Sequence, residues 1–372
     1  METLPDIQSL SNFHKNVSRQ KPPQINSLKK SDGSHSIPGM DTARTLTKTH
    51  FPSQTPLMAT KYSGKIIQSS EILSADIDWV TEKLIVQAMA GFQAKKSPGT
   101  DGLKPVVFQH LPANIIKYLN FIYRACVMFS FTPTIWKVTR LIFIPKPGKS
   151  AYNVAKAYRP ISLSNYFLKT LERLAGWKMK LALKNNPVHS KQHGFRSDRS
   201  TESAISDAAN YIESHILDCK FCVGISLDIQ AAFDSIKPHK IKQALLDHGG
   251  DRLMVNWYYN YLIHRNIYTE ISGTKLAFST SMGFPQGGVN SADFWIIVFN
   301  PALKIINRGE LNGDGFADDL LVMMGGYSLK AAMKELQNCI NDLIKWGKEY
   351  GLKFNSDKTV VVIFHRRKIH EH

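Results

Sequence analysis

Two adjacent carboxylates, Asp318 and Asp319, interrupt an otherwise apolar run of this 372-residue chain. Phe316-Ala317 precedes them, Leu320 to Met324 follows, and the turn-forming Gly313-Asp314-Gly315 comes just before. A buried charge costs several kcal/mol unless it is paired or binds a metal, so a strand of this kind needs a cation for its acids. The alternative is that the pair forms the solvated turn of a hairpin.

A third acid, Asp228, stands near the end of a second apolar run, Val223 to Ile229. Two strand-like runs that each carry a carboxylate at one end can hold two divalent cations between them. Two-metal phosphoryl transfer requires such an arrangement. Hard oxygen ligands favour Mg²⁺, or Mn²⁺ in its place. Asp234 lies six residues after Asp228, but Ala231-Ala232 between them indicates a turn or helix start, so we interpret Asp234 as structural.

The charge balance points to a polyanionic partner. The formal net charge is +17, and Lys and Arg are spread along the chain rather than gathered in one tail. A basic surface of this size favours nucleic acid, although solubility alone is the plainer explanation.

The four cysteines indicate a reducing compartment rather than a disulfide framework. Cys219 and Cys222 have the spacing of zinc ligands, but no second pair completes a site, so we expect them to pack in a strand. With neither a signal-peptide core nor a long apolar run, we expect an intracellular protein that is neither secreted nor membrane-spanning and has no membrane partner.

The chain divides by composition into two parts. Residues 1–73 are rich in Ser, Thr, Lys, Pro and Gln with little apolar periodicity, which predicts a disordered or linker segment. From Ser74, which can cap a helix, to residue 372, helical and strand-like runs alternate in an α+β order. Strands from distant parts of the chain are expected to form a small antiparallel sheet.

Several motifs, in a fixed order, resemble the reverse transcriptase domain of non-LTR retrotransposons of the jockey or LINE type. The resemblance extends from about Lys95 to Phe364 and consists of Ser97-Pro98-Gly99-Thr100-Asp101-Gly102, Ile144-Pro145-Lys146-Pro147-Gly148, Tyr158-Arg159-Pro160-Ile161-Ser162-Leu163, Gln192-His193-Gly194-Phe195-Arg196, Leu227-Asp228 to Ala232-Phe233-Asp234, Gly283-Phe284-Pro285-Gln286-Gly287, Phe316-Ala317-Asp318-Asp319, and Gly351-Leu352-Lys353-Phe354 to Lys358-Thr359.

The resemblance implies a right-hand polymerase fold with fingers and an antiparallel palm sheet. It implies an RNA-directed DNA polymerase that adds dNTPs to a DNA primer on an RNA template. Because such an element copies itself into chromosomal DNA, it also implies a location in the nucleus, the cytoplasm or both. Such elements usually carry an endonuclease before this domain and a thumb after it. The stretches before Lys95 and after Phe364 are too short for either, so we expect a fragment or degraded copy, without a thumb and with a poor grip on primer and template.

The same resemblance assigns the metal site. Asp228 and Asp318 correspond to the direct metal ligands, together with the backbone carbonyl at Ile229, and Asp319 has a supporting part. Lys358 falls where a protonated amine serves as general acid near the pyrophosphate. Lys353 competes for that role, and a plain solvated lysine is the alternative for both.

Further residues correspond to the nucleotide-binding positions of the family. Lys146 and Arg159 lie where the fingers reach the triphosphate, and the bidentate guanidinium of Arg159 suits phosphate better. Phe233 would close the sugar pocket against a ribose 2′-hydroxyl, unless it is an ordinary core aromatic. Gln286 and Gly287 would approach the nucleotide or template, unless their loop simply starts a helix.

The loop from Gln192 to Arg196 is expected to touch the template or primer backbone, except His193, which we interpret as a satisfied core or surface histidine. The chain departs from the family at Asn290 and Ala292, where leucine and proline are usual, and this leaves the packing of the following helix open.

Two other functions remain possible from the sequence. One is an inactive nucleic-acid-binding remnant that keeps the fold and the basic surface but not a productive geometry. The other is an RNA-templated RNA polymerase, against which Phe233 and the Pro285-Gln286-Gly287 loop argue.

Overall fold

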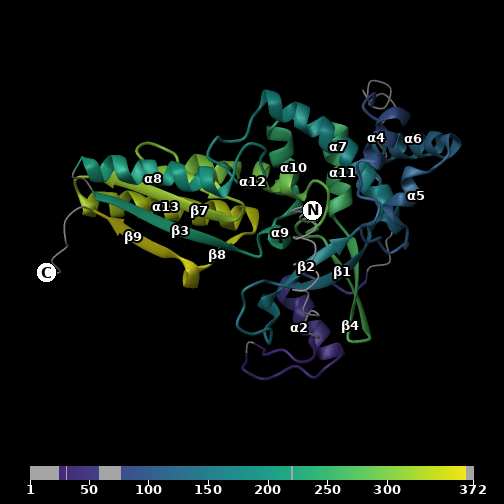
Figure 1. Ribbon diagram of the computed structural model, residues 1–372, viewed down its shortest axis with the longest axis horizontal. Helices are drawn as coiled ribbons and strands as arrows, with labels where there is room; N and C mark the ends of the chain where they lie inside the picture. The colour runs from purple at the N-terminus through teal and green to yellow at the C-terminus, as the bar shows by residue number, and fades with distance from the viewer. Residues whose placement is uncertain (1–24, 31, 58–76, 219–220, 366–372) are drawn as a thin grey trace, which may run out of the picture.

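The computed structural model describes residues 25–30, 32–57, 77–218 and 221–365. The fold contains two separate sheets: in Figure 1 the larger lies at the left, and the smaller lies below and to the right of the centre. The larger has the order β6-β7-β3-β8, and β9 also pairs with β3. Its strands are β3 (Phe221–Gln230), β6 (Asn312–Phe316), β7 (Asp319–Gly326), β8 (Lys353–Phe354) and β9 (Val360–Phe364).

All pairs in this larger sheet are antiparallel, and they join segments far apart in sequence. The predicted antiparallel sheet and the mixed α+β class are therefore confirmed. Apolar side chains alternate between two covered faces. Helix α13 (Leu329–Tyr350) packs with Val223, Ile225 and Val322 in the main core, whereas α8 (Thr201–Leu217) covers Cys222 and Met323 on the other face. The predicted packing role of Cys222 is confirmed, and Cys219 lies outside the described residues.

The smaller sheet has the order β2-β1-β4-β5. Its strands are β1 (Val138–Pro145), β2 (Tyr158–Leu163), β4 (Arg265–Ile271) and β5 (Thr274–Thr280). The central pair, β1 and β4, is parallel, and the outer pairs are antiparallel. Cross-strand partners share a face, so Ile144 and Arg159 project from the same side of this sheet.

Helices fill the space between and beside the sheets. They are α4 (Glu82–Ala90), α5 (Pro105–Gln109), α6 (Ala113–Met128), α7 (Tyr166–Asn185), α9 (Ala232–Ser235), α10 (Pro238–Asp247), α11 (Arg252–Leu262) and α12 (Ser291–Ile305), with short 3₁₀ turns η1 (Thr134–Lys137), η2 (Ala155–Ala157) and η3 (Ser356–Lys358). One large apolar core runs through them to α13. Because α12 is mostly apolar and ten of its fifteen residues are buried, it forms the centre of this core.

The prediction of a disordered or linker segment over residues 1–73 is wrong for residues 25–57. Helix α2 (Met40–His50) lies against the smaller sheet (Figure 1), and Leu28 and Leu46 are fully buried there. Phe51 packs on Leu141 and Phe278 of that sheet. The segment needs few apolar residues of its own to pack, because the smaller sheet supplies most of the apolar surface in this contact. The remainder of the segment, and Ser74, lie outside the described residues; the first helix of the following part begins at Glu82 with Thr81 as its cap.

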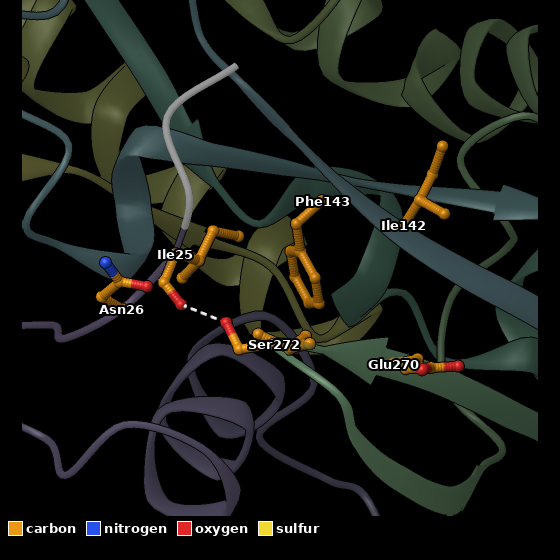
Figure 2. Close-up of a pocket in the computed structure, with 7 residues that line it drawn as sticks. Ile25, Asn26, Ile142, Phe143, Glu270 and Ser272 are labelled. Carbon is orange, nitrogen blue, oxygen red and sulfur yellow. Dashed lines mark hydrogen bonds between the residues drawn. The ribbon is translucent and has the colours of Figure 1, made fainter. Parts of the chain in front are cut away.

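A cavity of about 430 Å³ opens between this N-terminal segment and the smaller sheet. Figure 2 shows Phe143 and Ile142 of β1 on one side and Ile25 on the other, with the Ser272 hydroxyl donating to the Ile25 carbonyl at 2.9 Å. None of its lining residues belongs to the sites expected from the sequence. Among the described helices, none has the length and apolarity to cross a membrane.

Candidate active site

The larger sheet brings the three predicted carboxylates to one end. Asp228 pairs directly across from Asp319 at the last position of the β3–β7 ladder. Phe316 pairs with Asp319, so Ala317 and Asp318 form the two-residue turn of the β6–β7 hairpin. Ala317 has a φ of 55°, which is uncommon without glycine and marks a turn that its surroundings hold in place. The two strand-like runs expected to deliver carboxylates to one place are therefore neighbouring strands of one sheet.

The carbonyl of Ile229 is directed toward this group of acids by the alternation of the strand. The Asp228 carbonyl accepts from the Asn355 N–H at 2.8 Å, on the β8 side of β3. Successive backbone carbonyls of a strand point to opposite edges, so the Ile229 carbonyl points toward the β7 side. The ladder with β7 has already ended at Asp228, and no β7 residue pairs with Ile229 in the described structure. A backbone oxygen is thus available beside the carboxylates.

The electrostatics of the three acids favour a cation. Burial raises the pKa of Asp318, and the negative charge of Asp228 raises it further. Burial likewise raises the pKa of Asp319, followed by the charges of Asp318 and Asp228. Carboxylates that repel one another in a partly dry site gain most from a bound divalent ion, and these hard oxygen donors, with the Ile229 carbonyl, fit Mg²⁺ or Mn²⁺.

Two side chains from the turn after β8 engage Asp228. The Lys358 ammonium lies 2.9 Å from Oδ1, and the Asn355 amide donates to Oδ2 at 3.2 Å. Lys353, the competing candidate, instead pairs with Gln230 in β8 and faces solvent. Asn355 was not singled out from the sequence. The sequence held one indication of its role: Asn355 lies between the short strand β8 and Lys358. Because β8 pairs with the end of β3, the turn that follows β8 lies beside Asp228.

The smaller sheet contributes two further cations. Lys146 follows β1 and lies within electrostatic range of Asp228 and Asp318. Burial and then the neighbouring Arg159 lower the pKa of Lys146. Arg159 projects from β2 and is exposed. The structure therefore brings Lys146, Arg159 and Lys358 around the carboxylate end of the larger sheet.

The expectation that the loop from Gln192 to Arg196 touches nucleic acid is wrong for two of its residues. Gln192 is fully buried, and Gly194 is buried against the turn. The loop runs beside β6: the Gly315 N–H donates to the Lys191 carbonyl at 2.9 Å, and the His193 N–H donates to the Gly315 carbonyl at 2.8 Å. A Cβ on Gly194 would lie 2.1 Å from the Ala317 nitrogen. The glycine that suggested an exposed loop instead permits close packing under the acidic turn.

His193 is buried and hydrogen-bonded, as expected. Its Nδ1 lies 2.7 Å from Ser203 Oγ and its Nε2 lies 3.4 Å from Asp314. His193, Asp207 and Asp314 form the one group of three whose ligand atoms lie within 4.8 Å of one another among the described residues. The Lys191 ammonium already lies 3.3 Å from both carboxylates, so an internal cation neutralises this group and it braces β6. The carboxylates of Asp228, Asp318 and Asp319 are spaced more widely.

Phe233 belongs to a chain of aromatic contacts that reaches the acidic turn. It stacks on Trp295 at 5.6 Å between ring centroids and meets Phe284 and Phe195 edge-on. The Trp295 indole N–H donates to the Ala317 carbonyl at 2.6 Å. Phe233 is only half-buried, so one part of the ring packs in the core and another part faces outward.

The Gln286 loop connects β2 of the smaller sheet with helix α9. The Ser162 N–H of β2 donates to the Gln286 carbonyl at 2.7 Å. Gly287 has a φ of 109°, and a Cβ there would lie 2.7 Å from the Ser162 carbonyl oxygen. The glycine expected to let the backbone approach a ligand therefore lets it approach β2. Gln286 donates from Nε2 to Asp234 at 2.8 Å.

Asn290 is one of the two departures from the family pattern, and its side chain is hydrogen-bonded and closely packed. Its Oδ1 accepts from the Tyr258 hydroxyl at 3.1 Å. Its Nδ2 packs so closely on Gly176 that a Cβ there would lie 2.1 Å away. Helix α12 thus begins on a buried and bonded asparagine, and the residue is compatible with regular packing.

Comparison with known proteins shows similarity to reverse transcriptases. The family model described as "Reverse transcriptase (RNA-dependent DNA polymerase)" matches residues 144–370. The chain is 27% identical to "Probable RNA-directed DNA polymerase from transposon BS" of Drosophila melanogaster, over 77% of this chain and 32% of that protein. It is 26% identical to "RNA-directed DNA polymerase from mobile element jockey" of the same organism, over 81% of this chain and 33% of that protein.

The chain spans about a third of the length of the curated relatives it matches. Among solved structures, apo telomerase from Candida tropicalis, truncated from its C-terminal domain, aligns with a TM-score of 0.47 and 14% identity, over 70% of this chain and 57% of that one.

Proposed function

We propose that this chain, which belongs to the reverse transcriptase (RNA-dependent DNA polymerase) family, extends a DNA primer with dNTPs on an RNA template. It is related to the reverse transcriptases of the jockey, BS, R1 and X-element retrotransposons at about 25% identity. We assign the larger sheet to a palm and the smaller sheet to fingers. The observation that carries the proposal is the direct pairing of Asp228 with Asp319 beside the Asp318 turn.

In this proposal Asp228, Asp318 and the Ile229 carbonyl hold the metal, and Asp319 supports them. Bound divalent cations would lower the pKa of the primer 3′-hydroxyl and stabilise the leaving pyrophosphate. Lys358 is the candidate general acid, because it already contacts Asp228 and can donate a proton to the departing phosphate oxygen.

The remaining residues bind the incoming nucleotide. Arg159 and Lys146 neutralise the triphosphate from the smaller sheet. Phe233 excludes a 2′-hydroxyl by steric contact, since the aromatic neighbours Trp295 and Phe284 fix its ring. Gln286 and Gly287 line the same region from the loop that rests on β2. Asp319 is exposed and Asp228 and Asp318 are half-buried, so the carboxylates lie at the surface, where a polymeric substrate can reach them.

Primer extension on an RNA template tests the proposal, with wild type beside Asp318→Asn in Mg²⁺ and in Mn²⁺. We expect extension by the wild type and a loss of about a thousandfold in the variant, which is about 4 kcal/mol of barrier. Equal rates would refute the assignment of Asp318. A folded protein that binds RNA–DNA hybrid in a salt-sensitive manner but incorporates nothing would instead establish the nucleic-acid-binding remnant.

A further inference from the structure

Gln286, which the proposed function places beside the nucleotide, is hydrogen-bonded to Asp234, a residue to which the proposed reaction gives no role. Gln286 Nε2 donates to Asp234 Oδ2 at 2.8 Å, although the two residues lie 52 positions apart. Asp234 is 7% exposed and belongs to α9, next to Phe233. Gln286 is half-buried in the loop before α12. The pair therefore connects the inside of the protein to the region assigned to the nucleotide.

The backbone on both sides of the pair is fixed. The Gly283 N–H donates to the Ile236 carbonyl at 2.7 Å, and the Phe284 N–H donates to the Phe233 carbonyl at 2.9 Å. Gly283 has a φ of 65°, and a Cβ on it would lie 2.2 Å from the Phe233 carbonyl oxygen. Buried Arg265 donates to the carbonyls of Met282 and Gly283. These contacts hold the backbone of the loop against α9. The side-chain amide of Gln286 can still rotate and exchange the positions of its oxygen and nitrogen.

The ionised form of Asp234, which Arg265 and the bond from Gln286 favour against the effect of burial, settles that orientation. It can only accept hydrogen bonds, so the amide has to turn its NH₂ group toward Asp234. The amide oxygen is then directed away from Asp234. Within the described residues it accepts no hydrogen bond from the protein, and the backbone carbonyl of Gln286, not the side chain, bonds Ser162.

We propose that Asp234 is a positioning residue that turns the Gln286 amide so that its oxygen faces the incoming nucleotide as a hydrogen-bond acceptor. This inference rests on the proposed function. An acceptor at this position selects hydroxyl or N–H donors of the sugar or base and repels phosphate oxygens. Without Asp234 the amide has two orientations of similar energy, and one of them presents the wrong group.

Stability alone does not explain a carboxylate at this position. Burial raises the pKa of Asp234 to about 7, although Arg265 and the bond from Gln286 act in the opposite direction. A neutral side chain of the same shape would be easier to bury. Retaining the acid at a cost in stability is typical of a residue kept for function.

A double-mutant cycle of Asp234→Asn and Gln286→Met tests the proposal, with dNTP incorporation as the readout. Asparagine keeps the shape but can donate or accept, so the orientation is no longer imposed; methionine keeps the length of Gln286 without its amide. We expect Asp234→Asn to raise KM for dNTP by roughly three- to tenfold, the effect of one hydrogen bond, with a smaller change in kcat. In the Gln286→Met background the same change should leave KM unaltered. Equal effects in both backgrounds would overturn the proposal.

A second measurement does not depend on activity. Selective ¹⁵N labelling of glutamine, with Gln286→Met to assign the signal, reports exchange of the Gln286 side-chain amide protons. We expect protection in the wild type and its loss in Asp234→Asn. An unprotected amide in the wild type refutes the inference even if the enzyme is active. A protected amide in a protein that incorporates no nucleotide refutes the proposed function, and with it the nucleotide-facing role, while leaving the bond itself established.

Discussion

A single methyl group under the acidic turn should disable the site without unfolding the protein. The Cβ of Ala at position 194 would lie 2.1 Å from the Ala317 nitrogen and 2.9 Å from its Cα, whereas side-chain carbons essentially never approach below 3.0 Å. The Gln192–Arg196 loop and the turn therefore have to separate by about 1 Å. Misplacement on the order of 1 Å can reduce a rate by about a hundredfold, because the reacting groups lose their alignment.

The loss of stability should be moderate by comparison. Overpacking typically costs about 1–3 kcal/mol, since neighbours shift to relieve the contact. The assay is single-turnover primer extension of Gly194→Ala on an RNA template, with thermal unfolding of the same preparation. We expect about a hundredfold slower extension and a Tm lowered by only a few degrees.

Gly326→Ala is the matched control. Gly326 lies at the other end of β7, where an added Cβ meets no atom within 4 Å. It should keep wild-type extension and stability. Wild-type rates for Gly194→Ala would refute the reasoning, because the turn would then tolerate the displacement. Equal loss of activity in Gly326→Ala would show that the assay reports general damage.

Three further predictions concern other parts of the site. Burial raises the pKa of Asp234 from 3.8 to about 7, so the folded state holds its proton more tightly and the wild type loses stability as pH rises from about 4 to 7. Relative to wild type, Asp234→Asn should gain about 4 kcal/mol of unfolding free energy over that interval, measured by denaturant titration; a constant difference contradicts it. Phe233→Val should raise incorporation of rNTP relative to dNTP by about tenfold or more in a competition assay, whereas an unchanged ratio would show the ring to be only a core residue. Lys358→Ala should tighten Mn²⁺ binding by roughly two- to fivefold in calorimetry, because the ammonium that competes for Asp228 is removed; unchanged or weaker binding would count against that competition.

Local sequence patterns were sufficient for the acidic strands. Asp228 lies near the end of one apolar run and Asp318-Asp319 lie at the start of another, and such runs pair only in registers that bury their apolar faces. The antiparallel sheet and its acidic end could therefore be predicted before any contact was known. The position of the turn did not follow: Gly313-Asp314-Gly315, which we expected to form it, lies in strand β6, and the turn falls at Ala317-Asp318.

The N-terminal helix could not be predicted in this way. Its buried face consists of Thr42, Ala43, Leu46 and Thr47, which is too polar to register as an amphipathic pattern. Its packing depends on an apolar sheet surface about 100–230 positions later in the sequence. The average composition of residues 1–73 is polar, and it therefore does not reveal a short ordered segment that packs on a sheet formed by distant residues.

The roles of Gly194 and Asn355 were also beyond local reasoning. A glycine in a polar loop suggests flexibility and exposure, and only the Ala317 backbone beside it shows why a side chain has no space. Asn355 acquires its role because β8 pairs with β3 and places the following turn at Asp228. In both cases the informative contact joins residues more than 120 positions apart.

The acidic turn is held from several independent directions, and this explains how a strained residue persists there. Gly194 packs beneath the Ala317 nitrogen, Trp295 donates to the Ala317 carbonyl, and Asp228 pairs beside it through Asp319. Each support comes from a different segment, so no single one defines the position of Asp318. Removing two supports together should therefore slow catalysis by more than the product of the separate effects, because a turn displaced by the first change is still held by the other supports and the second change removes one of these. Comparing Gly194→Ala, Trp295→Phe and the double variant in primer extension tests this, and purely multiplicative rates would mean that the supports act independently.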